Sequence, residues 1–197
     1  MWFYHKVFMR DSNTFVSKGV TMAYFTSREI TAIIMCAALW SVLSAYIAPI
    51  FWNATHMPFF CDMLGIISLT LVLWWTRKFG TVTITGIIAT IITLMLNTFA
   101  TQFFGFTAAA VVFDILTKLI GYRNCLDRAL LSIVSLLSTS MAAAAVAGVI
   151  IGSLFMSLNF GGLVVFVILH AAGGAIGGTI GLILIKALSA RISLQKM

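Results

Sequence analysis

Few residues inside the apolar segments of this chain could do acid–base or ligand-binding chemistry. Four ionisable groups interrupt those segments: Asp62, Asp114, Lys118 and His170. Asp114 and Lys118 are four positions apart, which places them on one face of a helix at ion-pair spacing. A charged side chain at the centre of a bilayer costs about 3 kcal/mol or more and usually serves a purpose. The pair therefore indicates either a proton relay or partner contact, or a structural ion pair whose lysine reaches the headgroups.

No catalytic or metal-binding motif accompanies these groups. The sequence contains no GxSxG, no HExxH, no phosphate-binding loop and no paired carboxylates. Its three cysteines stand singly, without the spacing of a metal site, and we interpret them as small apolar side chains. We therefore predict that the chain is not an enzyme, has no catalytic residues and needs neither a cofactor nor a metal.

Aromatic and polar side chains gather between the apolar segments. Aromatic walls with a few amides and an imidazole suit a small flat molecule. The alternative is an interfacial aromatic belt, which explains the phenylalanines and tryptophan but not Asn97, Gln102 or His170. We predict one aromatic-walled substrate site near one membrane face, built from His170, Asn97, Asn159, Trp52, His56 and Gln102.

Composition fixes the class of protein that must position these residues. Of 197 residues, 61% are hydrophobic and only 9% are charged, and the mean hydropathy is +1.11. A soluble domain has about 45–50% apolar and about 25% charged residues. A chain of this length buries only about 70% of its surface on folding, so the remaining apolar surface must face lipid. The net charge of +7 is spread thinly between apolar segments and does not indicate nucleic-acid binding.

Six apolar segments approach the roughly 20 residues that a membrane-spanning helix needs. The first follows the capping-box pattern Thr26-Ser27-Arg28-Glu29. The expected spans are Glu29–Ile50, Asp62–Trp75, Thr81–Ala100, Phe103–Ile120, Ala129–Met156 and Leu163–Leu188. We therefore predict an all-α integral membrane protein with six transmembrane helices in one compact bundle. Residues 1–25 form a cytoplasmic or interfacial lead-in, 26–190 the membrane domain and 191–197 a cytoplasmic tail.

The basic residues predict the orientation of this bundle. In a six-span arrangement all twelve fall on one side: Lys6, Arg10, Lys18, Arg28, Arg77, Lys78, Lys118, Arg123, Arg128, Lys186, Arg191 and Lys196. Because lysine and arginine are enriched in cytoplasmic segments, both termini are expected in the cytoplasm. The protein is then a multi-pass protein of the cell membrane.

Three stretches resemble the substrate-capture (S) components of energy-coupling factor (ECF) transporters. The first is the alanine-studded opening Ser27-Arg28-Glu29-Ile30-Thr31-Ala32-Ile33-Ile34-Met35-Cys36-Ala37-Ala38. The second is Met57-Pro58-Phe59-Phe60-Cys61-Asp62-Met63-Leu64-Gly65, and the third is the glycine-rich His170-Ala171-Ala172-Gly173-Gly174-Ala175-Ile176-Gly177-Gly178. The resemblance covers roughly residues 25 to 190 and does not match the binding signature of any one vitamin subfamily.

The resemblance implies a membrane-embedded subunit that captures a vitamin or similar micronutrient from outside for ATP-driven uptake. A membrane coupling subunit and ATPase subunits would be its partners, and Ala37, Ser41 and Ala45 of the first span would face the coupling subunit. Two alternatives stay open. One is an accessory subunit of a membrane enzyme complex, and the other is a small self-contained secondary transporter that uses Asp114, Lys118 and His170.

Overall fold

A computed structural model describes residues 24–55 and 57–194, and all regular structure in these ranges is helical. The helices are α2 Ser27–Thr55, α3 Phe59–Thr76, α4 Thr81–Leu96, α5 Phe103–Ile120, α6 Tyr122–Leu126, α7 Ala129–Ile150 and α8 Phe160–Leu194, with a π-helical turn η1 at Ile151–Phe155. The predicted all-helical class is confirmed. The calls on residues 1–23, His56 and residues 195–197 lie outside the described residues.

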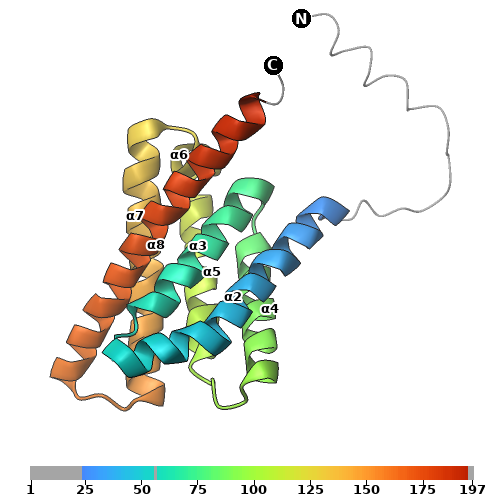
Figure 1. Ribbon diagram of the computed structural model, residues 1–197. Coiled ribbons are helices and arrows are strands. Elements are labelled where there is room, and N and C mark those ends of the chain that lie inside the picture. Colours follow the sequence, from blue (N-terminus) through green and yellow to red (C-terminus); the bar gives the residue numbers. More distant parts are fainter. Residues whose placement is uncertain (1–23, 56, 195–197) are drawn as a thin grey trace, which may run out of the picture.

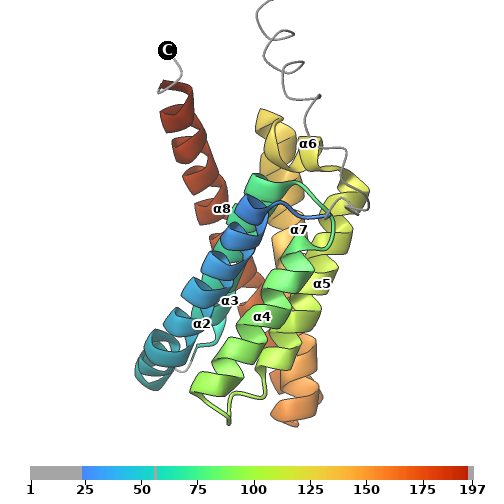
Figure 2. The same ribbon diagram turned by 90° about the vertical axis from the view of Figure 1, so that its right-hand side faces the viewer.

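The long helices run up and down in one bundle (Figures 1 and 2). Five elements of the described chain are long and apolar enough to cross a membrane: α2, α3, α5, α7 continued into η1, and α8. The remaining long element, α4, has 16 residues and a length of about 24 Å, short of a bilayer core of about 30 Å. The apolar bundle therefore supports a membrane-embedded protein. The start of α2 and the end of α8 lie at the same end of it (Figure 1).

The first span begins where the capping box predicted. The backbone N–H of Thr26 donates to Glu29 Oε2 at 2.7 Å, and the N–H of Glu29 donates to Thr26 Oγ1 at 3.4 Å. These reciprocal bonds satisfy backbone donors that a helix start otherwise leaves without partners. The helix then continues past Pro49 to Thr55, five residues beyond the expected Ile50.

The third span is shorter than expected because Asn97 ends it. The helix stops at Leu96 instead of Ala100, and Asn97 adopts an extended backbone. Its side-chain Oδ1 accepts a hydrogen bond from the N–H of Phe99 at 3.1 Å. Asparagine favours turns through this kind of local bond, which competes with helix continuation. The turn that follows brings Ala100 and Phe103 into the interior of the bundle.

Glycines of α8 allow close contact with two neighbouring helices. A Cβ on Gly177 would come within 2.8 Å of the Met63 carbonyl oxygen on α3, and one on Gly174 within 2.5 Å of the Ser140 carbonyl oxygen on α7. Helices meet this closely only where side chains are absent. The glycine stripe of the sixth span therefore packs inside the bundle, as expected from its spacing.

At the end of the bundle that holds the start of α2, polar contacts fix the turn between α3 and α4. Arg77 forms a two-bond ion pair with Asp127, each bond 2.8 Å long. Lys78 Nζ lies 2.8 Å from Glu29 Oε2. These contacts connect the turn to the α6–α7 connection and to the start of α2.

The predicted Asp114–Lys118 ion pair is wrong. Asp114 Oδ2 accepts hydrogen bonds from the N–H of Gly80 at 2.9 Å, the N–H of Thr83 at 3.1 Å and the Thr83 hydroxyl at 2.9 Å. Lys118 instead places its ammonium 4.0 Å from the ring centroid of Phe79. The aspartate binds the free N–H groups at the start of α4, where the helix dipole also favours a negative charge. A local spacing rule could not anticipate this partner on another helix.

Candidate functional site

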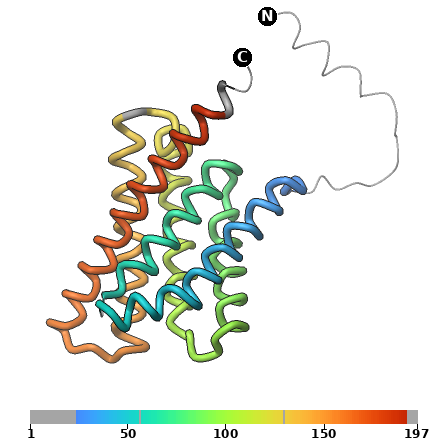
Figure 3. The backbone as a smooth tube through the Cα atoms, in the orientation of Figure 1, coloured from blue at the N-terminus to red at the C-terminus, as the bar shows by residue number. Residues whose placement is uncertain are grey.

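A cavity of about 510 Å³ lies at the end of the bundle opposite the turn that holds Arg77 and Lys78. Its walls come from the last turns of α2, the start of α3, the α4–α5 turn, η1 and the first half of α8. The backbone path in Figure 3 shows the three connections that surround this end: α2 to α3, α4 to α5, and α7 to α8. The volume falls in the range of small-molecule sites, about 300–1,000 Å³.

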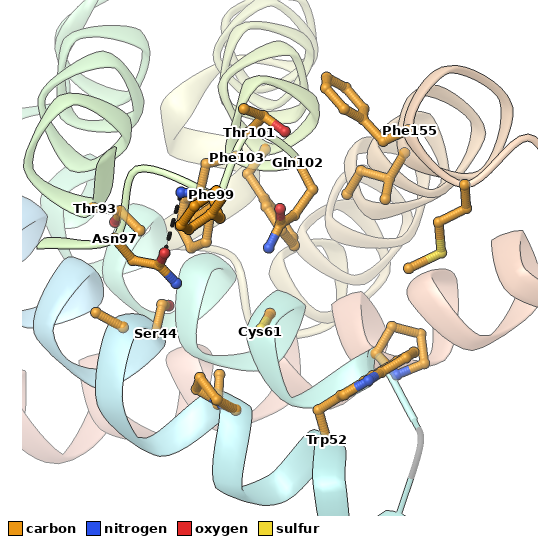
Figure 4. A pocket seen from close by; sticks show the side chains of 18 of the residues that line it. Ser44, Trp52, Cys61, Thr93, Asn97, Phe99, Thr101, Gln102, Phe103 and Phe155 are labelled. Atoms are coloured by element: carbon orange, nitrogen blue, oxygen red, sulfur yellow. Dashed lines mark hydrogen bonds between the residues drawn. The ribbon is translucent and has the colours of Figure 1, made fainter. Parts of the chain in front are cut away.

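Aromatic side chains form much of the cavity wall. Trp52 stands on the α2 side, and Phe99 and Phe103 come from the α4–α5 turn and the start of α5 (Figure 4). Phe106, Phe155 and Phe166 complete the set. Aromatic rings offer large rigid faces on which a flat ring system can stack.

Three buried polar atoms of this wall have no hydrogen-bond partner among the described residues. They are Ser44 Oγ on α2, Thr93 Oγ1 on α4 and His170 Nε2 on α8. Leaving a buried polar group without a partner costs about 1–3 kcal/mol, and native proteins retain few of them. Three such atoms from three helices around one cavity therefore mark it as a place where a ligand forms hydrogen bonds.

The imidazole of His170 is held by a carboxylate on another helix. Its Nδ1 lies 2.7 Å from Asp62 Oδ2, and each side chain is only 1% exposed. The approach is off the direction of a linear hydrogen bond, since neither atom meets hydrogen-bond geometry. The ring also packs edge-on against Phe166, with centroids 4.5 Å apart. Asp62 and Phe166 together fix the ring at the cavity wall.

The described residues that line the cavity include no lysine, arginine, aspartate or glutamate. The charged Asp62 lies behind His170 and is not among the lining residues. A site with this wall favours a ligand held by stacking and neutral hydrogen bonds over one held by ion pairs. In the part of the chain that the structure describes, no group of three His, Cys, Asp or Glu could hold a metal ion.

Four of the six predicted site residues line this one cavity: Trp52, Asn97, Gln102 and His170. Asn159 does not, because it serves the start of α8, where its Oδ1 accepts the N–H of Gly162 at 2.8 Å. His56 lies outside the described residues. Asn97 is bound to its own turn through Oδ1, so its amide nitrogen is the atom left for a ligand.

The prediction that Ala37, Ser41 and Ala45 face a partner protein needs correction. Ala37 and Ser41 are fully buried, and the Ser41 hydroxyl donates to the Ala89 carbonyl oxygen on α4 at 2.9 Å. Ala45 lies on the cavity wall. Small residues at this spacing permit a close helix contact, and here the contacting helix belongs to the same chain.

Sequence reasoning missed Ser44, Thr93 and the role of Asp62. A lone serine or threonine in an apolar helix commonly bonds to the carbonyl one turn earlier, so its type alone carries no signal. Asp62 was noticed only as the start of a span. Its position three residues after the start of α3 could have suggested a buried carboxylate with a partner, though not which one.

No protein-family model, curated protein or solved structure matches the chain.

Proposed function

We propose that this chain is the membrane-embedded substrate-binding subunit of an ECF-type importer, which captures a vitamin-like molecule from outside. The observation that supports it best is the convergence of Ser44 Oγ, Thr93 Oγ1 and His170 Nε2 on one aromatic-walled cavity. A cavity that only filled space would be lined by apolar groups or by polar groups already bonded within the protein.

The position of the cavity agrees with capture from outside. The described basic residues lie in the elements at the other end of the bundle: Arg28, Arg77, Lys78, Lys118, Arg123, Arg128, Lys186 and Arg191. If that end faces the cytoplasm, the cavity lies near the outer surface. A membrane coupling subunit and ATPase subunits would then supply the energy for release inside.

Purification from native membranes in mild detergent tests this proposal. We expect a coupling subunit and ATPases to copurify, and native mass spectrometry to show a retained small molecule that the Thr93→Val variant retains less well. Thr179→Val, on the exposed side of α8, is the matched control and should keep the molecule. Uptake into vesicles should require ATP. A chain that copurifies with neither partner nor small molecule would contradict the proposal.

One observation favours a second function, a small proton-coupled transporter. Asp62 and His170 form a buried pair that can hold a proton beside the cavity. Intramembrane carboxylates and histidines serve as proton relays in transporters. This form of the alternative uses Asp62 instead of Asp114, which is bound to the start of α4. Uptake by the purified chain alone in vesicles with a pH gradient and no ATP would favour it.

A further inference from the structure

The surroundings of the Asp62–His170 pair decide which hydrogen-bonding role His170 can play. A second, very small void of about 10 Å³ lies beside Asp62, with Trp40, Ile66, Leu69 and Phe106 among its lining residues. Cys61 precedes Asp62 and lines the main cavity, and Gly148 of α7 lies against the imidazole. Among the described residues lining either space, no lysine or arginine is present to balance the carboxylate.

A buried pair without other charges is most stable when its own charges cancel. An uncompensated ion in an apolar interior is far more costly than a neutral or zwitterionic pair. Two arrangements give zero net charge: an ionised Asp62 with a protonated His170, or a neutral Asp62 that donates to Nδ1 of a neutral His170. In both arrangements Nε2 carries a hydrogen, because Nδ1 is the atom at 2.7 Å from the carboxylate.

We propose that the Asp62–His170 pair shares one proton and thereby fixes Nε2 of His170 as a hydrogen-bond donor at the cavity wall. The site then selects an uncharged planar molecule that presents a carbonyl oxygen or ring nitrogen as acceptor. This inference rests on the proposed function and names the chemical class of its substrate.

Asn97 supplies a second donor on a different helix end. Its Oδ1 is occupied by the N–H of Phe99, so its amide NH₂ is the group that a ligand can meet. Figure 4 shows Asn97 beside Thr93 and Ser44, whose hydroxyls can donate or accept. A ring with acceptors at two edges satisfies both sides of the cavity, while the aromatic wall stacks on its faces.

The protonation of Nε2 can be measured without any ligand. Protein labelled with ¹⁵N-histidine is placed in lipid nanodiscs, and the His170 signals are identified by their loss in His170→Gln. We expect Nε2 to show the chemical shift of a protonated ring nitrogen at neutral pH. A pyridine-type, unprotonated Nε2 would overturn the inference.

Two uncharged bicyclic probes test the selectivity. Caffeine has only hydrogen-bond acceptors, and indole has only a donor. We expect millimolar caffeine, but not indole, to shift the Nε2 signal of His170. Calorimetric affinity for caffeine should fall at least about tenfold in His170→Leu and be partly retained in His170→Gln, whose amide still donates. Thr179→Val should bind caffeine as the unmodified protein does.

The opposite results have distinct meanings. No His170-dependent binding of caffeine, or stronger binding of indole, overturns the acceptor selectivity. If a retained native molecule is nevertheless found, the proposed function stands and only this inference fails. If Nε2 is protonated and caffeine binds but no transport partner copurifies and no ATP-driven uptake occurs, the proposed function fails alone.

Discussion

His170 on α8 and Asp62 on α3 lie with Nδ1 and Oδ2 only 2.7 Å apart, and both side chains are almost fully buried. The contact is possible because α8 carries glycines where it meets α3. A Cβ on Gly173, three residues after His170, would come within 2.5 Å of the Phe59 carbonyl oxygen. The glycine stripe and the buried pair are therefore parts of one helix contact at the wall of the cavity.

The pair predicts strongly non-additive effects on stability. His170→Leu leaves a buried carboxylate without a partner and should lower the free energy of unfolding by about 3–5 kcal/mol. In the double variant Asp62→Asn, His170→Leu no charge remains, so much of that loss should be recovered. Unfolding midpoints in detergent measure both. A double variant less stable than His170→Leu alone would contradict the pairing.

The hydroxyls of the cavity predict a gain of stability with a loss of binding. Thr93→Val removes a buried hydroxyl that has no partner among the described residues, so the unliganded protein should become more stable by up to about 1 kcal/mol. Retention of a small molecule should fall in the same variant.

Ser41→Ala is the contrasting control for that experiment. Ser41 bonds the carbonyl oxygens of Ala37 at 2.7 Å and Ala89 at 2.9 Å, so its loss should cost about 1 kcal/mol without affecting retention. Thermal midpoints and native mass spectrometry give the two measurements. Destabilisation by both variants would mean that Thr93 has a structural partner.

The start of α4 predicts different roles for Asp114 and Lys118. Asp114→Ala removes three hydrogen bonds to one buried carboxylate oxygen and should destabilise the protein by at least about 2 kcal/mol. Lys118→Met keeps an apolar contact with Phe79 and should cost less than about 1 kcal/mol. Equal losses, with rescue by exchange of the two charges, would restore the ion-pair hypothesis.

The α8–α3 contact predicts which glycines can be replaced. Gly177→Ala would bring Cβ within 2.8 Å of a backbone carbonyl oxygen and should cost about 1–3 kcal/mol. Gly161→Ala in the first turn of the same helix meets only Asn159 Oδ1 at 4.0 Å and should be neutral or slightly stabilising. Unfolding midpoints compare the two. Similar effects at both positions would contradict the packing of α8 on α3.

The one-sided basic residues predict the orientation in the membrane. In a background without Cys36, Cys61 and Cys125, Thr55→Cys at the exposed end of α2 should react with an impermeant maleimide on intact cells. Arg128→Cys, exposed at the other end of the bundle, should react only after the membrane is opened. Labelling in the reverse order would place the cavity on the cytoplasmic side.

The sequence alone determined the features that depend on neighbouring residues. Composition required lipid-facing helices, because the apolar surface exceeds what a chain of this size can bury. The capping box at Thr26 and Glu29 set the start of α2, and Phe103–Ile120 was predicted with its observed bounds. Amides, an imidazole and aromatic rings between the spans indicated which end of the bundle carries a cavity. Helical periodicity, caps and composition are local, so they are visible without a fold.

Only the tertiary structure decided which helix each of these residues meets. Asp62 with His170, Asp114 with the start of α4, and Ser44 with Thr93 at one cavity are all contacts between helices distant in sequence. The stripe of Ala37 and Ser41 has the same spacing whether it meets α4 or another protein, and burial against α4 settled its role. A single helix exposes its polar and small residues equally to every possible neighbour. The packing of the whole bundle selects among them, because only that packing pairs the buried charges and closes the gaps.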